Sequence, residues 1–196
     1  MKDLTDIGMM GISAKEELAK QGIEIDDILY GSAELNLNTL NLLYLLERHY
    51  STLLEGRFLD LFCGNGLLLQ AMVKEAPGLE LYGVDGNPQA TEAARMVCPT
   101  AKLAEKICPP LPYEANFFHI VHGNKIMDYA DTQRGLGNPF PETFSFLELS
   151  AEIYRVILPR GIYVPCDDLL PRELVILNSQ GFLQQEKSGR MLFEKR

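Results

Sequence analysis

The chain has 196 residues, enough for one domain with a covered sheet and too few for two full-sized domains. Hydrophobic residues make up 46% of it and charged residues 23%, an ordinary composition for a soluble globular protein. The formal net charge of −9 argues against a chain that wraps nucleic acid by itself, because phosphate binding needs a surface of Lys and Arg.

Cysteine spacing and the length of apolar runs indicate in which cellular compartment the protein is expected. The four cysteines form no C-x-x-C pair, so we expect reduced thiols rather than a disulfide framework. The first residues lack the basic-then-apolar order of a secretory signal, and no apolar run is long enough to span a bilayer. We therefore expect a soluble, cytoplasmic protein with no membrane partner and no metal site.

The polar N-terminal region, interrupted by glycines, predicts a helical extension or lid over residues 1–35, ahead of a single domain over residues 36–196. A capping-box pattern predicts a helix over residues 13–21. We also expect residues 25–30 to be helical and to pack near a ligand. Leucines that recur on one face then predict a helix over residues 36–50.

From Arg57 onward, short apolar runs alternate with helical patterns. Strands are expected at 58–63, 79–84, 101–106, 117–122, 162–166, 182–187 and 190–195, and helices at 66–76, 88–97, 148–158 and 172–179. The third of these helices is expected to end at Pro159-Arg160-Gly161. This alternation predicts a doubly wound α/β fold, with a seven-stranded, mostly parallel sheet and an antiparallel C-terminal strand. Such sheets bind ligands at the carboxyl ends of their strands.

The strongest motif lies where the first of these strands meets its helix, and it reads Asp60-Leu-Phe-Cys-Gly64-Asn-Gly66. Glycines let the backbone approach a ligand without a Cβ in the way, and a helix N-terminus presents N–H groups to it. Asp85 closes the next strand, where a carboxylate can accept two hydrogen bonds from a ribose diol. A plain strand-to-helix turn is the alternative interpretation of the glycines.

Two cofactors, NAD and S-adenosylmethionine, are alternative interpretations of this motif. A dinucleotide site uses G-x-G-x-x-G, but Leu69 stands where the third glycine would be. Asp60 lies four residues before Gly64 and would repel a pyrophosphate, whereas it suits a ligand with an ammonium and a sulfonium group. Electrostatics therefore favour S-adenosylmethionine over NAD as the cofactor.

Several segments together resemble the successive motifs of class I S-adenosylmethionine-dependent methyltransferases. These segments are FLDLFCGNG, LYGVDGNPQATEAAR, LPYEANFFHIV, EIYRVILPRGIYV and Gly181-Phe182. The resemblance covers about residues 40–196 and implies a Rossmann-like methyltransferase fold with S-adenosylmethionine as cofactor.

The resemblance also implies a role for each motif. The amino-acid part of the cofactor would be lined by Asp60, Phe62, Gly64 and Gly66. Asp85 would hold the ribose hydroxyls, and Gly86 would lie beside the adenine. The adenine ring would be flanked by Lys106 and Ile107, and the site closed by His122 and Gly123.

Three positions depart from the family pattern. Phe62 and Arg160 stand where the family often has glycine, and His119 stands where Asp is usual at the start of the fourth strand. A degenerate copy of the fold that no longer binds the cofactor is therefore an alternative to an active enzyme.

Methyl transfer asks the protein mainly to align a nucleophile and exclude water, because the sulfonium methyl is already activated. Where a proton must leave the acceptor early, His122 is the first candidate for a general base, and a structural histidine is the alternative. Residues 128–146 follow the fourth strand and are expected to form part of the acceptor pocket. The substrate-binding candidates there are Asp128, Tyr129, Arg134 and Phe140. Cys166 resembles the nucleophile of pyrimidine C5 methyltransferases, but a buried structural cysteine is favoured.

We predict an S-adenosylmethionine-dependent methyltransferase, monomeric or homodimeric, that acts on a small-molecule acceptor. One alternative is an RNA or protein methyltransferase that acts with partner chains, since nucleic acid binding without a partner is not expected from the charge. The other is a non-catalytic binding module with the same fold.

Overall fold

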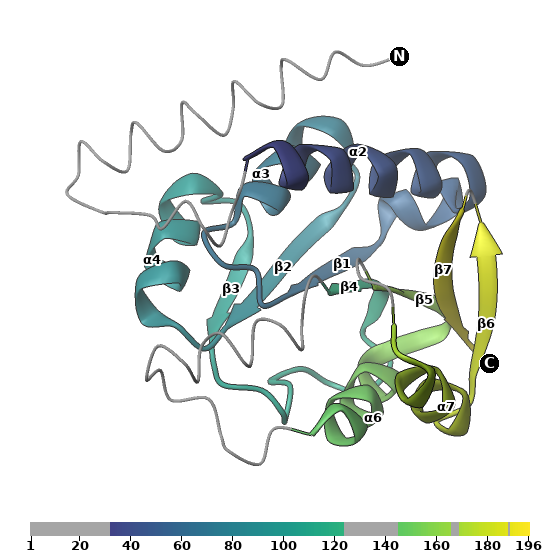
Figure 1. The fold of residues 1–196 in the computed structure, drawn as a ribbon. Coiled ribbons are helices and arrows are strands. Elements are labelled where there is room, and N and C mark those ends of the chain that lie inside the picture. The colour runs from purple at the N-terminus through teal and green to yellow at the C-terminus, as the bar shows by residue number, and fades with distance from the viewer. Residues whose placement is uncertain (1–31, 124–144, 166–168, 188) are drawn as a thin grey trace.

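The structure is a computed structural model that describes residues 32–123, 145–165, 169–187 and 189–196 (Figure 1). The helices predicted at 13–21 and 25–30 lie outside the described residues. No helix in the described ranges is long and apolar enough to cross a membrane.

Seven strands form one sheet, whose order β3-β2-β1-β4-β5-β7-β6 matches the predicted doubly wound fold. The strands are β1 (Arg57–Leu61), β2 (Glu80–Asp85), β3 (Lys102–Glu105), β4 (Phe118–Gly123), β5 (Ile157–Pro165), β6 (Phe182–Lys187) and β7 (Arg190–Lys195). Neighbours among β1 to β5 pair in parallel, while β7 pairs antiparallel with both β5 and β6. The prediction of a mostly parallel sheet with an antiparallel C-terminal element is confirmed.

Helices cover both faces of this sheet (Figure 1). They are α2 (Ser32–His49), α3 (Leu67–Glu75), α4 (Pro88–Val97), α6 (Phe146–Val156) and α7 (Pro171–Ser179), with a short 3-10 helix at Ser51–Glu55. Along β1, Phe58 packs in a buried cluster with leucines of α2 and α3, whereas Leu59 packs in another with α6. Alternate residues of the strand thus serve opposite faces, as expected for a sheet buried on both sides.

Two helix starts follow from local capping. The Asn87 side chain accepts hydrogen bonds from the first turn of α4, and Pro88 occupies its first helical position, as predicted. The Ser145 side chain caps α6, which begins at Phe146, two residues earlier than expected. Phe146 is buried, so its burial and the serine cap extend the helix toward its N-terminus.

The fifth strand differs most from the sequence expectation. Pro159-Arg160-Gly161 was expected as a turn before the strand, but β5 begins at Ile157 and these residues form an irregularity within it. Ile157 pairs with Phe118 and the pairing resumes at Ile162, opposite Ile120. Pro159 and Arg160 are exposed, whereas Ile157 is completely buried, so burial of Ile157 recruits the earlier residues into the strand.

Candidate functional site

The loop between β1 and α3, residues 62–66, turns through three positive φ angles. They are 55° at Phe62, 53° at Gly64 and 76° at Gly66. Glycine adopts this left-handed region without strain, whereas a residue with a Cβ does so at a cost. The loop is further fixed by hydrogen bonds from Cys63 N to the carbonyl of Val84 (3.2 Å) and from Gly66 N to the carbonyl of Cys63 (3.0 Å). We call residues 62–66 the glycine loop.

Asp85, at the carboxyl end of β2, ties the glycine loop to the next turn. Its Oδ2 accepts a hydrogen bond from Gly64 N (2.9 Å), and its Oδ1 accepts one from Asn87 N (2.8 Å). The side chain is completely buried. A carboxylate oxygen can accept more than one hydrogen bond, so a role in the loop does not exclude a role toward a ligand. The residue predicted to hold a ribose is therefore also part of the framework of the loop.

Asp60 and His122 form a buried pair across β1 and β4. The two residues are register partners, and His122 Nδ1 lies 2.8 Å from Asp60 Oδ1. Asp60 is 4% exposed and His122 2%, and the imidazole stacks on the ring of Phe58. With the proton on Nδ1, the imidazole donates to the carboxylate, which fixes the orientation of the ring.

Cys63, in the middle of the glycine loop, lies close to these carboxylates. Burial raises the pKa of the Cys63 thiol well above its usual value, and the negative charges of Asp60 and Asp85 raise it further. The thiol therefore stays protonated near neutral pH, so Cys63 serves as a small packing residue rather than a nucleophile.

The carboxyl end of β3 completes this edge of the sheet. Asp85 pairs with Glu105, and Lys106 N donates to the carbonyl of Asp85 (2.8 Å). A Cβ on Gly86 would lie 3.0 Å from Cγ1 of Ile107, so glycine allows the two segments to approach closely. The residues predicted to flank the adenine thus lie beside the residue predicted to hold the ribose.

Asn65 is a site residue that the motif analysis did not single out. It is 4% exposed, and its Nδ2 has no hydrogen-bond partner among the described residues. An unpaired buried amide donor is costly unless a ligand satisfies it. The sequence feature that could have indicated this residue is its position between Gly64 and Gly66 in the motif. A buried donor beside a helix N-terminus suits a ligand carboxylate, so the glycine loop fits the amino-acid part of S-adenosylmethionine.

The structure brings all nine predicted cofactor-binding residues to the carboxyl edge of β1, β2, β3 and β4. They are Asp60, Phe62, Gly64, Gly66, Asp85, Gly86, Lys106, Ile107 and His122. The predicted substrate-binding residues Asp128, Tyr129, Arg134 and Phe140 lie outside the described residues, as does Cys166. Phe146, at the end of the expected pocket segment, is buried at the start of α6. No cluster of His, Cys, Asp and Glu able to hold a metal ion occurs within the described part of the chain.

Comparison with known proteins finds similarity to methyltransferases. Residues 23–110 match the family model of the methyltransferase small domain. The chain is 35% identical over 81 residues to ribosomal RNA small subunit methyltransferase C of Shewanella denitrificans, which is 41% of this chain and 22% of that protein. The chain therefore spans about a fifth of the length of that relative.

Two solved structures resemble this fold, one over nearly the whole chain and the other over about three quarters of it. A TehB-like S-adenosylmethionine-dependent methyltransferase from Corynebacterium glutamicum superposes with a TM-score of 0.58 at 15% identity, covering 95% of each chain. Phosphoethanolamine N-methyltransferase 2 from Haemonchus contortus, in complex with S-adenosyl-L-methionine, gives 0.55 at 20% identity over 74% of this chain and 36% of that one.

The order of the sheet and these structural matches define the class I methyltransferase fold. The family match over residues 23–110 covers the part of this fold that contains the glycine loop and Asp85. Of the two solved structures, one is described as an S-adenosylmethionine-dependent methyltransferase and the other is a methyltransferase in complex with S-adenosyl-L-methionine.

Proposed function

We propose that the protein transfers a methyl group from S-adenosylmethionine to a small-molecule acceptor. The observation that carries this proposal is the convergence of the glycine loop, Asp85 and the Asp60–His122 pair on one edge of the sheet. The same edge is where doubly wound sheets bind their ligands. A direct test is calorimetric titration of the protein with S-adenosylmethionine and S-adenosylhomocysteine. Absence of binding would favour a non-catalytic module instead.

Four residues would hold the cofactor by its distinct chemical groups. The ribose hydroxyls would donate to Asp85, and the carboxylate of the amino-acid part would accept from Asn65 Nδ2. The ammonium group would lie near Asp60, with Gly64 allowing close approach of the backbone. When bound, the cofactor supplies a methyl group that is already activated by the sulfonium.

His122 is proposed as the general base for acceptors that must lose a proton. Asp60 lies in contact with Nδ1 and stabilises the imidazolium that forms when the imidazole takes that proton. The acceptor would reach His122 from the segment that follows β4. We propose that Asp128, Tyr129, Arg134 and Phe140 contribute its binding site.

RNA is the second candidate acceptor, because the curated relative is named for ribosomal RNA methylation. The net charge of −9 favours the small molecule unless a basic partner chain supplies the phosphate contacts. Incubation with methyl-labelled S-adenosylmethionine and either a metabolite extract or undermethylated ribosomal subunits separates the two. Label in the small-molecule fraction alone supports our proposal, and label in RNA alone contradicts it.

A further inference from the structure

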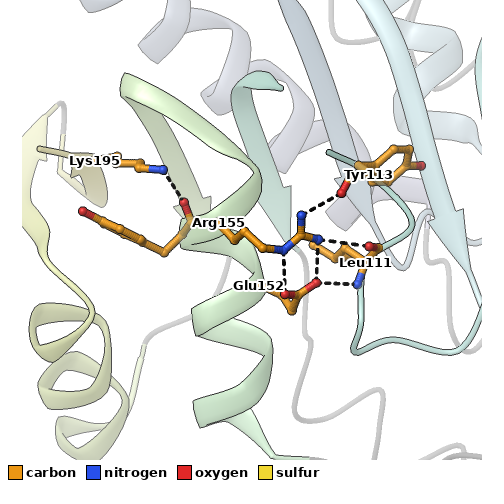
Figure 2. Close-up of polar contacts among 6 residues, drawn as sticks. Leu111, Tyr113, Glu152, Arg155 and Lys195 are labelled. Carbon is orange, nitrogen blue, oxygen red and sulfur yellow. Dashed lines mark hydrogen bonds and ion pairs between the residues drawn. The ribbon is translucent and has the colours of Figure 1, made fainter. Parts of the chain in front are cut away.

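Glu152 and Arg155 stand one turn apart on α6 and hold each other in a two-pronged ion pair (Figure 2). Arg155 Nε lies 2.7 Å from Glu152 Oε1, and Arg155 Nη2 lies 2.7 Å from Glu152 Oε2. The Arg155 guanidinium lowers the pKa of Glu152, and Glu152 in turn raises the pKa of Arg155. Both groups are therefore charged near neutral pH.

This pair also binds the backbone of another segment (Figure 2). Leu111 N donates to Glu152 Oε2 (2.8 Å), and the carbonyl of Leu111 accepts from Arg155 Nη2 (3.1 Å). Arg155 Nη1 donates to the carbonyl of Tyr113 (2.8 Å). The pair thus satisfies three backbone groups that no strand or helix pairs. Charge-assisted hydrogen bonds of this kind are among the stronger ones.

The segment held in this way is the connection between β3 and β4, residues 106–117, which we call the post-β3 loop. It begins at Lys106, bonded to the carbonyl of Asp85, and Ile107 packs against Gly86. Farther along, Leu111 is buried and the Tyr113 hydroxyl donates to the carbonyl of Gly83 (3.2 Å). The loop therefore runs from the cofactor edge of the sheet to α6.

The post-β3 loop has little support from β3 itself. That strand is four residues long and lies at the edge of the sheet, and both of its end residues are exposed. Beyond Ile107, the loop is anchored to α6 through Glu152 and Arg155, and to β2 through the Tyr113 hydroxyl. Because the loop is short, we expect the α6 anchor to contribute to the position of Ile107 relative to Gly86.

We propose that Glu152 and Arg155 are positioning residues for the adenine of the cofactor. They touch no ligand atom themselves; they hold the post-β3 loop so that Lys106 and Ile107 form one wall of the base site. This inference rests on the proposed function, since it takes the carboxyl edge of β2 and β3 as the place of the adenosyl group. It adds a link between α6 and the affinity for the base.

The test compares Arg155→Met and Glu152→Gln with the wild type in calorimetric titrations of two ligands. One is S-adenosylhomocysteine and the other is S-ribosylhomocysteine, which is the same molecule without its base. We expect each variant to bind S-adenosylhomocysteine about 10-fold more weakly, with the affinity for S-ribosylhomocysteine unchanged. Amide exchange at Leu111 should become faster in both variants, because its acceptor is weaker in Glu152→Gln and is no longer held by Arg155 in Arg155→Met.

Ile153→Val is the matched control, since Ile153 lies on the same helix but is completely buried in the core beneath it. This variant lowers stability but keeps the Glu152–Arg155 pair and its hydrogen bonds to the loop, so it should bind both ligands as the wild type does. Equal losses for both ligands, or no loss, would overturn the positioning role while leaving the proposed function intact. A wild type that binds neither ligand would remove the proposed function and the inference with it.

Discussion

Asp85 serves both the framework of the glycine loop and its proposed ligand, so its substitution should affect stability as well as binding. Asp85→Ala leaves the buried N–H of Gly64 and the half-buried N–H of Asn87 without their acceptor. We expect a loss of about 1–3 kcal/mol in the free energy of unfolding, measured by urea denaturation without ligand. Asp85→Asn keeps one oxygen acceptor and should lose less. Equal stability of the alanine variant and the wild type would contradict the framework role.

His119 makes the stability of the protein depend on pH. Its Nδ1 accepts a hydrogen bond from Arg57 N (3.0 Å), which requires the neutral imidazole. Burial lowers the pKa of His119, and the charge of Arg57 lowers it further. The stabilisation is thus complete above the unfolded pKa of about 6.5 and is lost as pH falls through the lower folded pKa.

The measurement for His119 is urea denaturation at pH 7.5 and pH 5 for the wild type and His119→Asn. The asparagine offers a similarly placed acceptor that does not titrate. We expect the wild type to lose stability relative to this variant on acidification. A constant difference between the two proteins at both pH values would show that His119 does not titrate with folding.

The φ angles of Phe62 and Arg160 bear on two of the departures from the family pattern. Phe62 and Arg160 stand where the family often has glycine, and their φ values are 55° and 66°. The sequence predicted glycine-like positions there but could not indicate how the larger side chains are accommodated. Phe62 is buried in the core that includes α6, so apolar burial offsets the backbone strain. Asn65 could not be predicted, because the lack of a hydrogen-bond partner for its side-chain amide is known only from the positions of its neighbours in the structure.

Among the elements, the approach of α3 to α4 depends on Gly66. A Cβ added there would lie 3.0 Å from the Cβ of Ala94 and 3.1 Å from its Cα, and the φ of Gly66 is 76°. Gly66→Ala should therefore lower the free energy of unfolding by about 1–3 kcal/mol, measured by thermal or urea denaturation. Both backbone strain and the contact with Ala94 contribute.

Gly189→Ala is the control that separates these two effects. Gly189 has a φ of 73°, but a Cβ there would meet nothing within 4 Å. Its substitution therefore reports the backbone term alone, and the excess loss in Gly66→Ala reports the contact between the helices. If the two variants lose the same stability, the close approach to Ala94 has no energetic weight.

Most helices and strands could be predicted, because the spacing of hydrophobic residues and the capping residues indicate the same boundaries along this chain. The helix at Pro88–Val97 and the strands at Phe182–Lys187 and Arg190–Lys195 have the expected bounds. The start of β5 could not be predicted, because Pro159 and Gly161 are turn residues by local preference. Only the pairing of Ile157 with buried Phe118 on another strand overrides that preference.

At the scale of the whole molecule, Lys195 joins the last strand to the end of α6, the start of β5 and the residues before β4. Its buried ammonium donates to Asn116 Oδ1 (2.8 Å) and to the carbonyls of Tyr154 (2.8 Å) and Ile157 (2.9 Å). Burial lowers the pKa of Lys195. One side chain thus connects β7, the C-terminal end of α6 and the residues that precede β4.

Lys195→Met should destabilise the molecule by about 2–3 kcal/mol, because three acceptors lose their donor while the apolar stem is preserved. Urea denaturation measures this loss. Lys187→Met, in the same hairpin, is the control, and it should change stability by less than about 0.5 kcal/mol. Similar values for the two variants would mean that the ammonium of Lys195 does not hold these parts together.

The aromatic residues around the post-β3 loop also provide an intrinsic spectroscopic signal. Tyr82 lies edge-on to Tyr113 at 5.9 Å between ring centroids, and Tyr113 stacks on Phe117 at 6.4 Å. The chain has no Trp, so tyrosines dominate its near-ultraviolet circular dichroism and its fluorescence. Rings locked in a fixed chiral arrangement give a dichroic signal that vanishes when packing loosens. Release of this loop from its packing can therefore be followed by near-ultraviolet circular dichroism, without a label or a ligand.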